Sequence, residues 1–121
     1  MPPVYLYKHK VLQILINLVR NAKYACDASE NPVKRLTLRV VNNPDRIQIS
    51  VIDTGIGISA ENLPHIFEHG FTTRKDGHGF GLHSAAMAAK EMGGSLTVFS
   101  AGINQGATFT LELPHSMKPD E

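Results

Sequence analysis

Two asparagines, Asn17 and Asn21, lie four residues apart in "ILINLVRNAKYACDAS" (14–29), where apolar residues recur at helical spacing. Asparagine is a mediocre helix former because its side chain competes for backbone hydrogen bonds, so the pair calls for an explanation. Residues i and i+4 share one face of a helix, so the two carboxamides project side by side. They are either solvated surface residues or, at the edge of a cleft, oxygen ligands for Mg²⁺, which normally accompanies polyphosphates.

A second candidate is Asp53, which ends an apolar strand pattern and is followed by "TGIGIS". A buried carboxylate needs a hydrogen-bond donor, and the exocyclic amine of adenine is one. Gly55 and Gly57 allow the backbone to turn tightly and approach a flat base. The same glycines have the local shape of a dinucleotide fingerprint. A Rossmann unit, however, needs a second parallel strand where this chain has "FTTRKDGHG", and the absence of GxxxxGK[ST] excludes a P-loop.

The segment 68–81, "EHGFTTRKDGHGFG", shows neither helical nor strand periodicity and contains four glycines. Gly77, Gly79 and Gly81 precede a helix pattern, and backbone without side chains at a helix start offers N–H donors to phosphate oxygens. Cations and hydroxyls that suit a polyphosphate lie in the same segment: Thr72, Thr73, Arg74 and Lys75. The alternative is a disordered surface loop, which the glycines also suit.

Length and composition limit the class of protein. The chain has 121 residues, of which 42% are hydrophobic, which fits one domain with a core. A net charge of +1 gives no support for nucleic-acid or membrane-surface binding, and no signal peptide or membrane span is expected. Cys26 is interpreted as a core residue in a reducing compartment rather than a reactive thiol. The six histidines lack metal-ligand spacing, so no zinc site is expected.

Hydrophobic periodicity predicts the elements that position these residues. The expected strands are 3–7, at a sheet edge, and 35–41, 46–53, 95–101 and 107–114. The expected helices are 10–29, 59–67 and 82–92, and the polar tail 115–121 is expected to fray. The order predicts an α+β fold, a two-layer sandwich with helices on one face of a mostly antiparallel sheet.

Four sequence boxes, in this order, resemble the catalytic, ATP-binding domain of sensor histidine kinases, within the wider GHKL ATPase group. They are an N box "QILINLVRNA" (13–22), a first glycine box "DTGIG" (53–57), an F box "IFEHGFTT" (66–73) and a second glycine box "GHGFGL" (77–82). The likeness covers about 4–114 and includes the closing strand pair. Each glycine motif alone is weak, but the ordered set is specific. It implies a Bergerat, or left-handed βαβ, fold with a mixed sheet, three helices and ATP beneath a lid at 68–81.

The resemblance also assigns roles by position. Asn21 matches the Mg²⁺ ligand, Asn17 is its N-box partner one turn earlier, and Asp53 matches the acceptor for the adenine amine. Thr108 matches a polar residue near that aspartate. The other expected nucleotide contacts are Tyr24, Gly55, Gly57, Phe71, Thr72, Thr73, Lys75, Gly77, Gly79, Phe80, Gly81 and Leu82. Tyr24 occupies a position where many members have a phosphate-contacting lysine, so that cation is left open among Lys75, Arg74 and Arg20.

Asn17 separates branches of the resembled group. ATP-hydrolysing members have a glutamate at this position, which activates water, and an asparagine cannot act as a general base. The implied function is therefore to bind Mg-ATP and supply the γ-phosphoryl group for histidine autophosphorylation in a two-component sensor kinase. The alternatives are a GHKL-type ATP-hydrolysing conformational switch, a serine kinase like the anti-sigma-factor kinases, and a degenerate interaction module.

The partners follow from the same resemblance. None of the six histidines lies in an H-E-x-x-x-P setting, so the phosphoacceptor is expected on a dimerisation helix outside this chain. The chain is expected to be a single cytoplasmic domain, 1–121, of a parent that is either soluble or membrane-anchored. It should bind ATP or ADP without phosphorylating itself, and a response regulator should act downstream.

Overall fold

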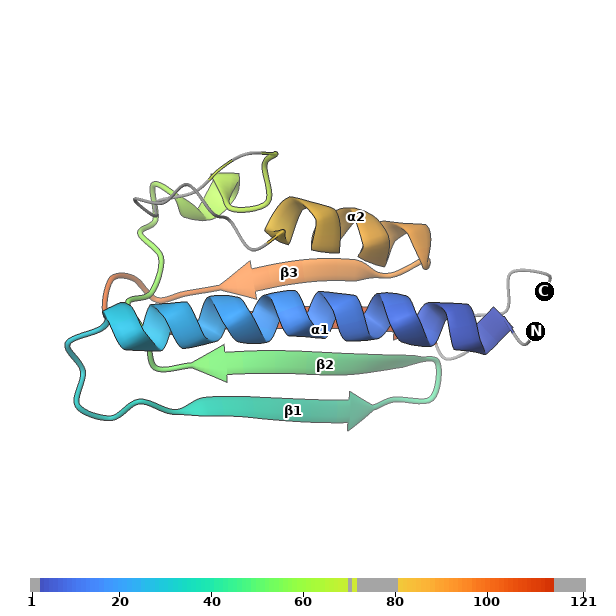
Figure 1. Cartoon of the computed structure of the whole chain (residues 1–121), viewed down its shortest axis with the longest axis horizontal. Coiled ribbons are helices and arrows are strands. Elements are labelled where there is room, and N and C mark those ends of the chain that lie inside the picture. Colours follow the sequence, from blue (N-terminus) through green and yellow to red (C-terminus); the bar gives the residue numbers. More distant parts are fainter. Residues whose placement is uncertain (1–2, 70, 72–80, 115–121) are drawn as a thin grey trace.

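The computed structural model describes residues 3–69, 71 and 81–114. Along the chain its elements are helix α1 (Pro3–Ala28), strands β1 (Leu36–Asn42) and β2 (Arg46–Asp53), a 3₁₀ turn η1 (Leu63–His65), helix α2 (Leu82–Glu91), and strands β3 (Ser95–Phe99) and β4 (Ala107–Pro114). Figure 1 shows α1 in front of the sheet and running alongside its strands, with β1 at one edge and β3 at the other. No helix among the described residues is long and apolar enough to cross a membrane.

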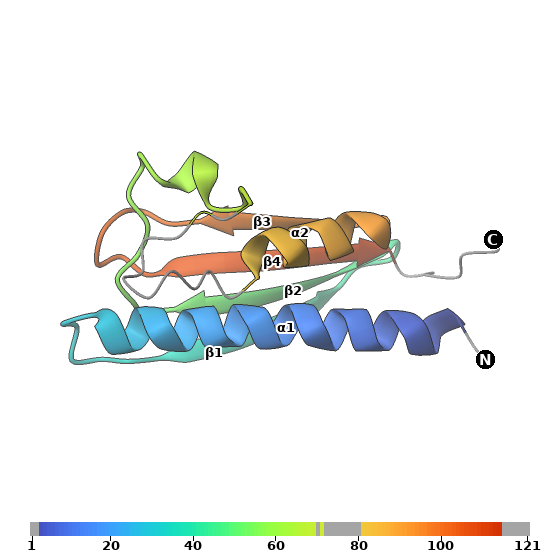
Figure 2. The same cartoon turned by 45° about the horizontal axis from the view of Figure 1, so that its top comes forward.

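The four strands form one sheet in the order β1-β2-β4-β3, and every neighbouring pair is antiparallel. The register places Asp53, at the end of β2, opposite Leu36 on one side and Ala107 on the other. Figure 2 shows the four strands in this order, with β3 at the top and β1 at the bottom. The end of β2 is therefore flanked by the beginnings of β1 and β4, and the loop that follows Asp53 emerges between them.

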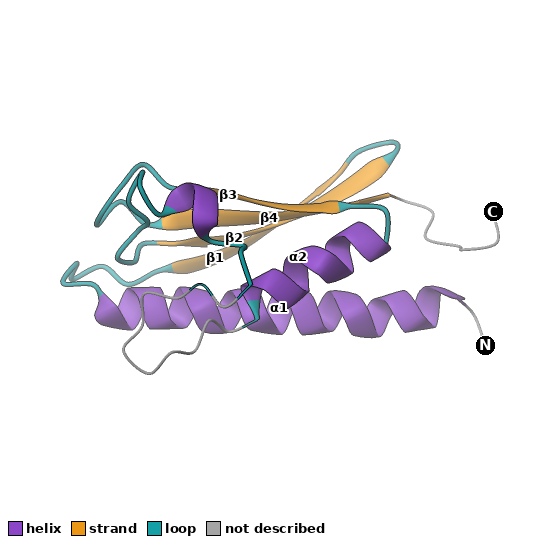
Figure 3. Cartoon of the chain, turned by 90° about the horizontal axis from the view of Figure 1, so that it is seen from above, coloured by secondary structure: helices purple, strands orange, loops and turns teal. Residues whose placement is uncertain are grey.

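Both helices cover the same face of the sheet (Figure 3). The core lies between these layers, because alternate residues of β4 and one stripe of α1 are apolar. The largest fully buried side chains are Phe109, Ile14, Leu18, Leu111 and Val51. This packing fixes the position of α1 on the sheet, with Ala25 of α1 against the loop that follows β2.

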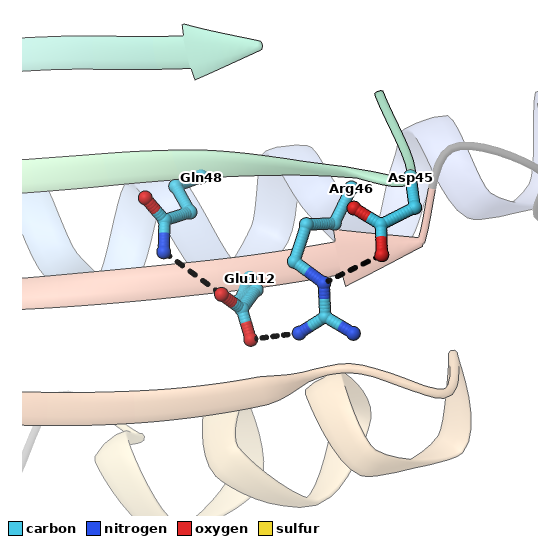
Figure 4. Close-up of polar contacts among 4 residues, drawn as sticks. All are labelled: Asp45, Arg46, Gln48 and Glu112. Carbon is cyan, nitrogen blue, oxygen red and sulfur yellow. Dashed lines mark hydrogen bonds and ion pairs between the residues drawn. The ribbon is translucent and has the colours of Figure 1, made fainter. Parts of the chain in front are cut away.

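The opposite face of the sheet is mainly polar. There Gln48 donates a hydrogen bond to Glu112 at 2.8 Å, and the Arg46 guanidinium pairs with the same carboxylate (Figure 4). Arg46 also lies 3.9 Å from Asp45. These contacts join β2 to β4 in the register that sets Asp53 against Ala107.

Three expectations about the elements are wrong. Residues 3–7 are not an edge strand but the first turns of α1, since a short apolar run fits either element and Pro3 is tolerated at a helix start. The helix expected over 59–67 is reduced to the 3₁₀ turn at Leu63–His65, where Pro64 cannot donate a backbone hydrogen bond. In the described part of the chain the sheet is wholly antiparallel rather than mixed, and there are two α-helices rather than three.

The other expected elements are confirmed. The strands expected at 46–53 and 107–114 have those bounds, and 35–41 is shifted by one residue. The helix expected over 82–92 ends one residue earlier, and the strand expected over 95–101 ends at Phe99. The α+β class and the two-layer arrangement follow from these elements. The lid segment other than 68, 69, 71 and 81, and the tail 115–121, lie outside the described residues.

Candidate functional site

Asp53 has a buried carboxylate of which one oxygen, Oδ1, accepts hydrogen bonds within the described part of the chain and the other, Oδ2, does not. Its residue is only 4% exposed, because it follows the inward-facing alternation of β2. Oδ1 accepts hydrogen bonds from the backbone N–H groups of Gly55 at 2.9 Å and Ala107 at 3.2 Å. Oδ2 is buried and has no hydrogen-bond partner among the described residues. A buried acceptor of this kind fits a ligand that brings its own donor, such as the amine of adenine.

Burial raises the pKa of Asp53 above its ordinary value, and the hydrogen bonds from Gly55 and Ala107 oppose that rise only in part. The folded protein therefore binds a proton at a higher pH than the unfolded chain does. By linkage, the contribution of Asp53 to the free energy of unfolding falls as the pH rises from the unfolded pKa through the raised folded pKa. Above that window the ionised carboxylate destabilises the ligand-free fold.

We therefore expect Asp53→Asn to melt at a higher temperature than the unsubstituted protein at pH 7, in the absence of ligand. Below about pH 4, where an ordinary aspartate is itself protonated, the advantage should disappear. Thermal melts of both proteins between these pH values measure the difference directly. An advantage that stays constant with pH would show that the charge on Asp53 has no energetic cost.

The loop after Asp53 packs tightly on the last turns of α1. The N–H of Ile56 donates to the carbonyl of Ala25 at 3.0 Å, and a Cβ atom on Gly55 would lie 2.5 Å from the carbonyl carbon of Ala25. Gly57 has a φ of +71°, and a Cβ atom there would lie 2.0 Å from the carbonyl oxygen of Gly102. Both glycines are thus required by close backbone contacts, in addition to the turn that the sequence predicts.

The N box meets the second glycine box at Asn17. A Cβ atom on Gly81 would lie 2.9 Å from Nδ2 of Asn17, and Gly81, with a φ of +68°, is the N-cap of α2. Asn17, Asn21 and Ala25 follow one another at i, i+4 and i+8, so they share one face of α1. Both asparagines are half-buried. Asn21 therefore lies between the start of α2 and the loop at Gly55, over an axial span of about 12 Å.

The F box contributes one core residue and one cavity residue. The ring of Phe67 packs edge-on against Phe109 with centroids 6.1 Å apart, and its carbonyl oxygen lies 3.0 Å from Nδ1 of His83. Phe71 lines a cavity of about 430 Å³ beside the first glycine box. The cavity is lined by Ala28, Glu30, Ile56, Gly57, Ile58, Ser59, Asn62, Ile66, Phe71, Ile103 and Asn104. Its lining is mostly apolar, with polar side chains from Ser59, Asn62 and Asn104.

The remaining predicted residues divide into three groups. Leu82, the first residue of α2, is buried in the core, and Tyr24 is half-buried on α1. Thr108 is not brought to the Asp53 carboxylate: β4 buries alternate residues from Ala107, so the Thr108 side chain lies on the polar face of the sheet. The last group lies outside the described residues: Thr72, Thr73, Lys75, Gly77, Gly79 and Phe80, with Arg74.

Two functional candidates had no signal in the motifs. Ala107 contacts Asp53 through its backbone N–H, which any residue except proline could provide. Ser100 donates from its hydroxyl to the carbonyl of Gly106 at 2.6 Å, and only the antiparallel pairing of β3 with β4 reveals this contact. Cys26 is buried, in agreement with its interpretation as a core residue.

The two asparagines on α1 are the candidate metal ligands that the sequence predicts. In the described part of the chain, no group of three or more His, Cys, Asp or Glu side chains could hold an ion. The carboxamides of Asn17 and Asn21 remain as donors, and neutral amide oxygens are hard ligands that fit Mg²⁺ when phosphate oxygens complete its shell.

Comparison with known proteins identifies the family. Residues 7–117 match the model of the histidine kinase-, DNA gyrase B- and HSP90-like ATPases. The chain is 36% identical to the sensor protein ChvG of Agrobacterium fabrum over 115 residues, covering 87% of this chain and 19% of ChvG. It is 33% identical to the sensor histidine kinase ZraS of Escherichia coli over 114 residues, covering 94% of this chain and 23% of ZraS. The chain thus spans about one fifth of these relatives.

The fold agrees with this family. The catalytic domain of histidine kinase ThkA superposes with a TM-score of 0.76 at 26% identity, over 90% of this chain and 68% of that domain. The mycobacterial sensor histidine kinase MprB has the same fold, with a TM-score of 0.69 over 88% of this chain and 70% of the MprB chain, at 22% identity. The chain belongs to the histidine kinase-, DNA gyrase B- and HSP90-like ATPase family, in the branch formed by the ATP-binding catalytic domains of sensor histidine kinases.

Proposed function

We propose that this chain binds Mg-ATP and supplies the γ-phosphoryl group to a histidine on the dimerisation helices of its parent sensor kinase. The observation that carries the proposal is the unpartnered Oδ2 of Asp53, buried beside the loop that packs on α1. A buried charge with a free acceptor is costly in the empty protein, and an adenine amine would satisfy it. Sequence similarity to sensor kinases supports the same assignment.

In this proposal α1 aligns the nucleotide. The adenine lies at the Ala25 and Gly55 end, and the phosphates lie toward Asn17 and the start of α2, because the N-terminus of a helix favours anions. Asn21, with Asn17 beside it, would hold Mg²⁺, which when bound neutralises phosphate charge. The polar residues of the lid, Lys75 among them, would complete the phosphate contacts.

The chemistry of Asn17 favours transfer over hydrolysis. Its carboxamide next to Gly81 cannot remove a proton from water at neutral pH. Phosphoryl transfer needs positioning and charge neutralisation more than a base on this side of the nucleotide. We therefore rank a hydrolytic switch below a kinase. A response regulator is the proposed recipient downstream, and the cytoplasm is the proposed location.

A transfer experiment tests the function. With γ-labelled ATP, the chain alone should remain unlabelled and release little phosphate. When dimerisation helices bearing a phosphoacceptor histidine are fused to its N-terminus, they should acquire label that is stable in base and lost in acid. Base-labile, acid-stable label would favour a serine kinase. Rapid release of free phosphate by the isolated chain would favour the hydrolytic switch instead.

A further inference from the structure

Ser100, the residue after β3, has a buried hydroxyl whose hydrogen bonds are complete. Its Oγ donates to the carbonyl of Gly106 at 2.6 Å and accepts from the N–H groups of Ile58 at 3.0 Å and Gly102 at 3.3 Å. A hydroxyl has one donor and two acceptor positions, so this set uses all of them. The residue is 9% exposed. One side chain thus joins the end of β3, the first glycine box loop and the approach to β4.

The bond to Gly106 acts on a peptide group that also touches Asp53. The carbonyl of Gly106 and the N–H of Ala107 belong to the same peptide, and that N–H donates to Oδ1 of Asp53 at 3.2 Å. The hydrogen bonds therefore run without a break from Ser100 through this peptide to the carboxylate. A hydrogen bond to the carbonyl polarises the peptide and strengthens donation by its N–H.

Two further contacts keep this loop in place. The N–H of Asn104 donates to the carbonyl of Ile56 at 2.7 Å, and the N–H of Gly106 donates to the carbonyl of Gly55 at 3.2 Å. A Cβ atom on Gly106 would lie 2.1 Å from the carbonyl oxygen of Asp53. The loop 100–106 is therefore packed on the first glycine box, and Ser100 is the side chain that ties the two together.

We propose that Ser100 is a positioning residue for base recognition. It orients the Gly106–Ala107 peptide and the loop at Ile58, so that Oδ1 of Asp53 is held and Oδ2 is aimed at the exocyclic amine of the purine. This inference rests on the proposed function, because it specifies how the adenine acceptor is aligned. Ser100 itself touches no reacting atom.

The test compares ATP with purine riboside triphosphate, which lacks only the 6-amine. The dissociation constant for purine riboside triphosphate divided by that for ATP, both measured by calorimetry with Mg²⁺, reports the contact between Asp53 and the amine. Ser100→Ala should lower this ratio by a factor of about three or more, as well as the melting temperature. A residue that only supports the fold would lower the melting temperature and leave the ratio unchanged, because both ligands bind the same folded population.

A control and a second variant sharpen the result. Ser50→Ala removes a hydroxyl that bonds Thr110 at 3.1 Å on the polar face of the same sheet, and it should leave the ratio unchanged. Ser100→Cys fills the same space with a weak donor and should lower the ratio, and it replaces Ser100→Ala if the alanine variant does not fold.

The outcomes separate the two proposals. Equal affinity of the unsubstituted protein for both triphosphates would overturn the adenine role of Asp53 itself. Clear discrimination by the unsubstituted protein that persists in Ser100→Ala or Ser100→Cys would overturn the role of Ser100 and leave the proposed function intact.

Discussion

Asp53→Asn should weaken binding of Mg-ADP about 100-fold, or about 3 kcal/mol. The carboxamide oxygen can replace Oδ1 and keep the hydrogen bonds from Gly55 and Ala107. Its NH₂ group then occupies the position of Oδ2, where it opposes the adenine amine, donor against donor. The variant loses a charge-assisted hydrogen bond and gains an unpaired buried donor. Isothermal titration with ADP and Mg²⁺ gives the affinity.

The matched control is Asp45→Asn, which removes the same charge from an exposed side chain in the turn between β1 and β2. It should bind nucleotide as the unsubstituted protein does. Because Asp53→Asn removes a charge that burial disfavours, its ligand-free fold should not be weakened. A folded Asp53→Asn protein with undiminished affinity for ADP would refute the candidate site.

Gly57→Ala should lower the free energy of unfolding by about 3 kcal/mol or more. Its φ of +71° costs a residue with a Cβ atom about 1 kcal/mol, and that atom would also lie 2.0 Å from the carbonyl oxygen of Gly102. The backbone of the two loops must separate to relieve this contact. Denaturant titration measures the loss, and nucleotide affinity should fall with it because the first glycine box moves.

Gly93→Ala is the matched control for this effect. Gly93 has a φ of +80°, so alanine there would have the same conformational strain, but its Cβ atom would have Pro114 Cγ as its nearest neighbour, at an ordinary 3.7 Å. Its loss should remain near 1 kcal/mol. If Gly57→Ala and Gly93→Ala lowered the free energy of unfolding equally, loop 100–106 would have moved away from the new Cβ atom at no cost, and it would not constrain the first glycine box.

Local sequence patterns predicted the strands of the sheet better than the short apolar run at the N-terminus. The alternation in 46–53 and 107–114 gave both strand bounds, because the same face of each strand packs on the helices. The run 3–7 does not show a clear alternation of apolar and polar residues, and it is continuous with the apolar pattern of α1. Such short apolar runs are ambiguous until the contacts around them are known.

The site shows a similar division. Asp53, Asn17 and Gly81 could be found because their residue types carry the chemistry, and the fold places Asn17 against Gly81. The Thr108 assignment misses the carboxylate by one residue, since neighbouring strand residues lie on opposite faces. Ser100 contacts Ile58, 42 residues away, and no local pattern encodes a pairing of that range.

The unbroken helix α1 has a consequence for how the nucleotide site can change. One half-buried face of α1 reaches Gly81 through Asn17 and Gly55 through Ala25, so the separation between these two contacts is set by helical pitch. Because α1 is one continuous helix, the distance along it between the Asn17 and Ala25 contacts stays constant whatever the conformation of the loops around it. Insertion of one residue between Asn17 and Asn21 would rotate the two ends of α1 by about 100° relative to each other, so Asn17 and Ala25 could no longer make both contacts from one face of the helix.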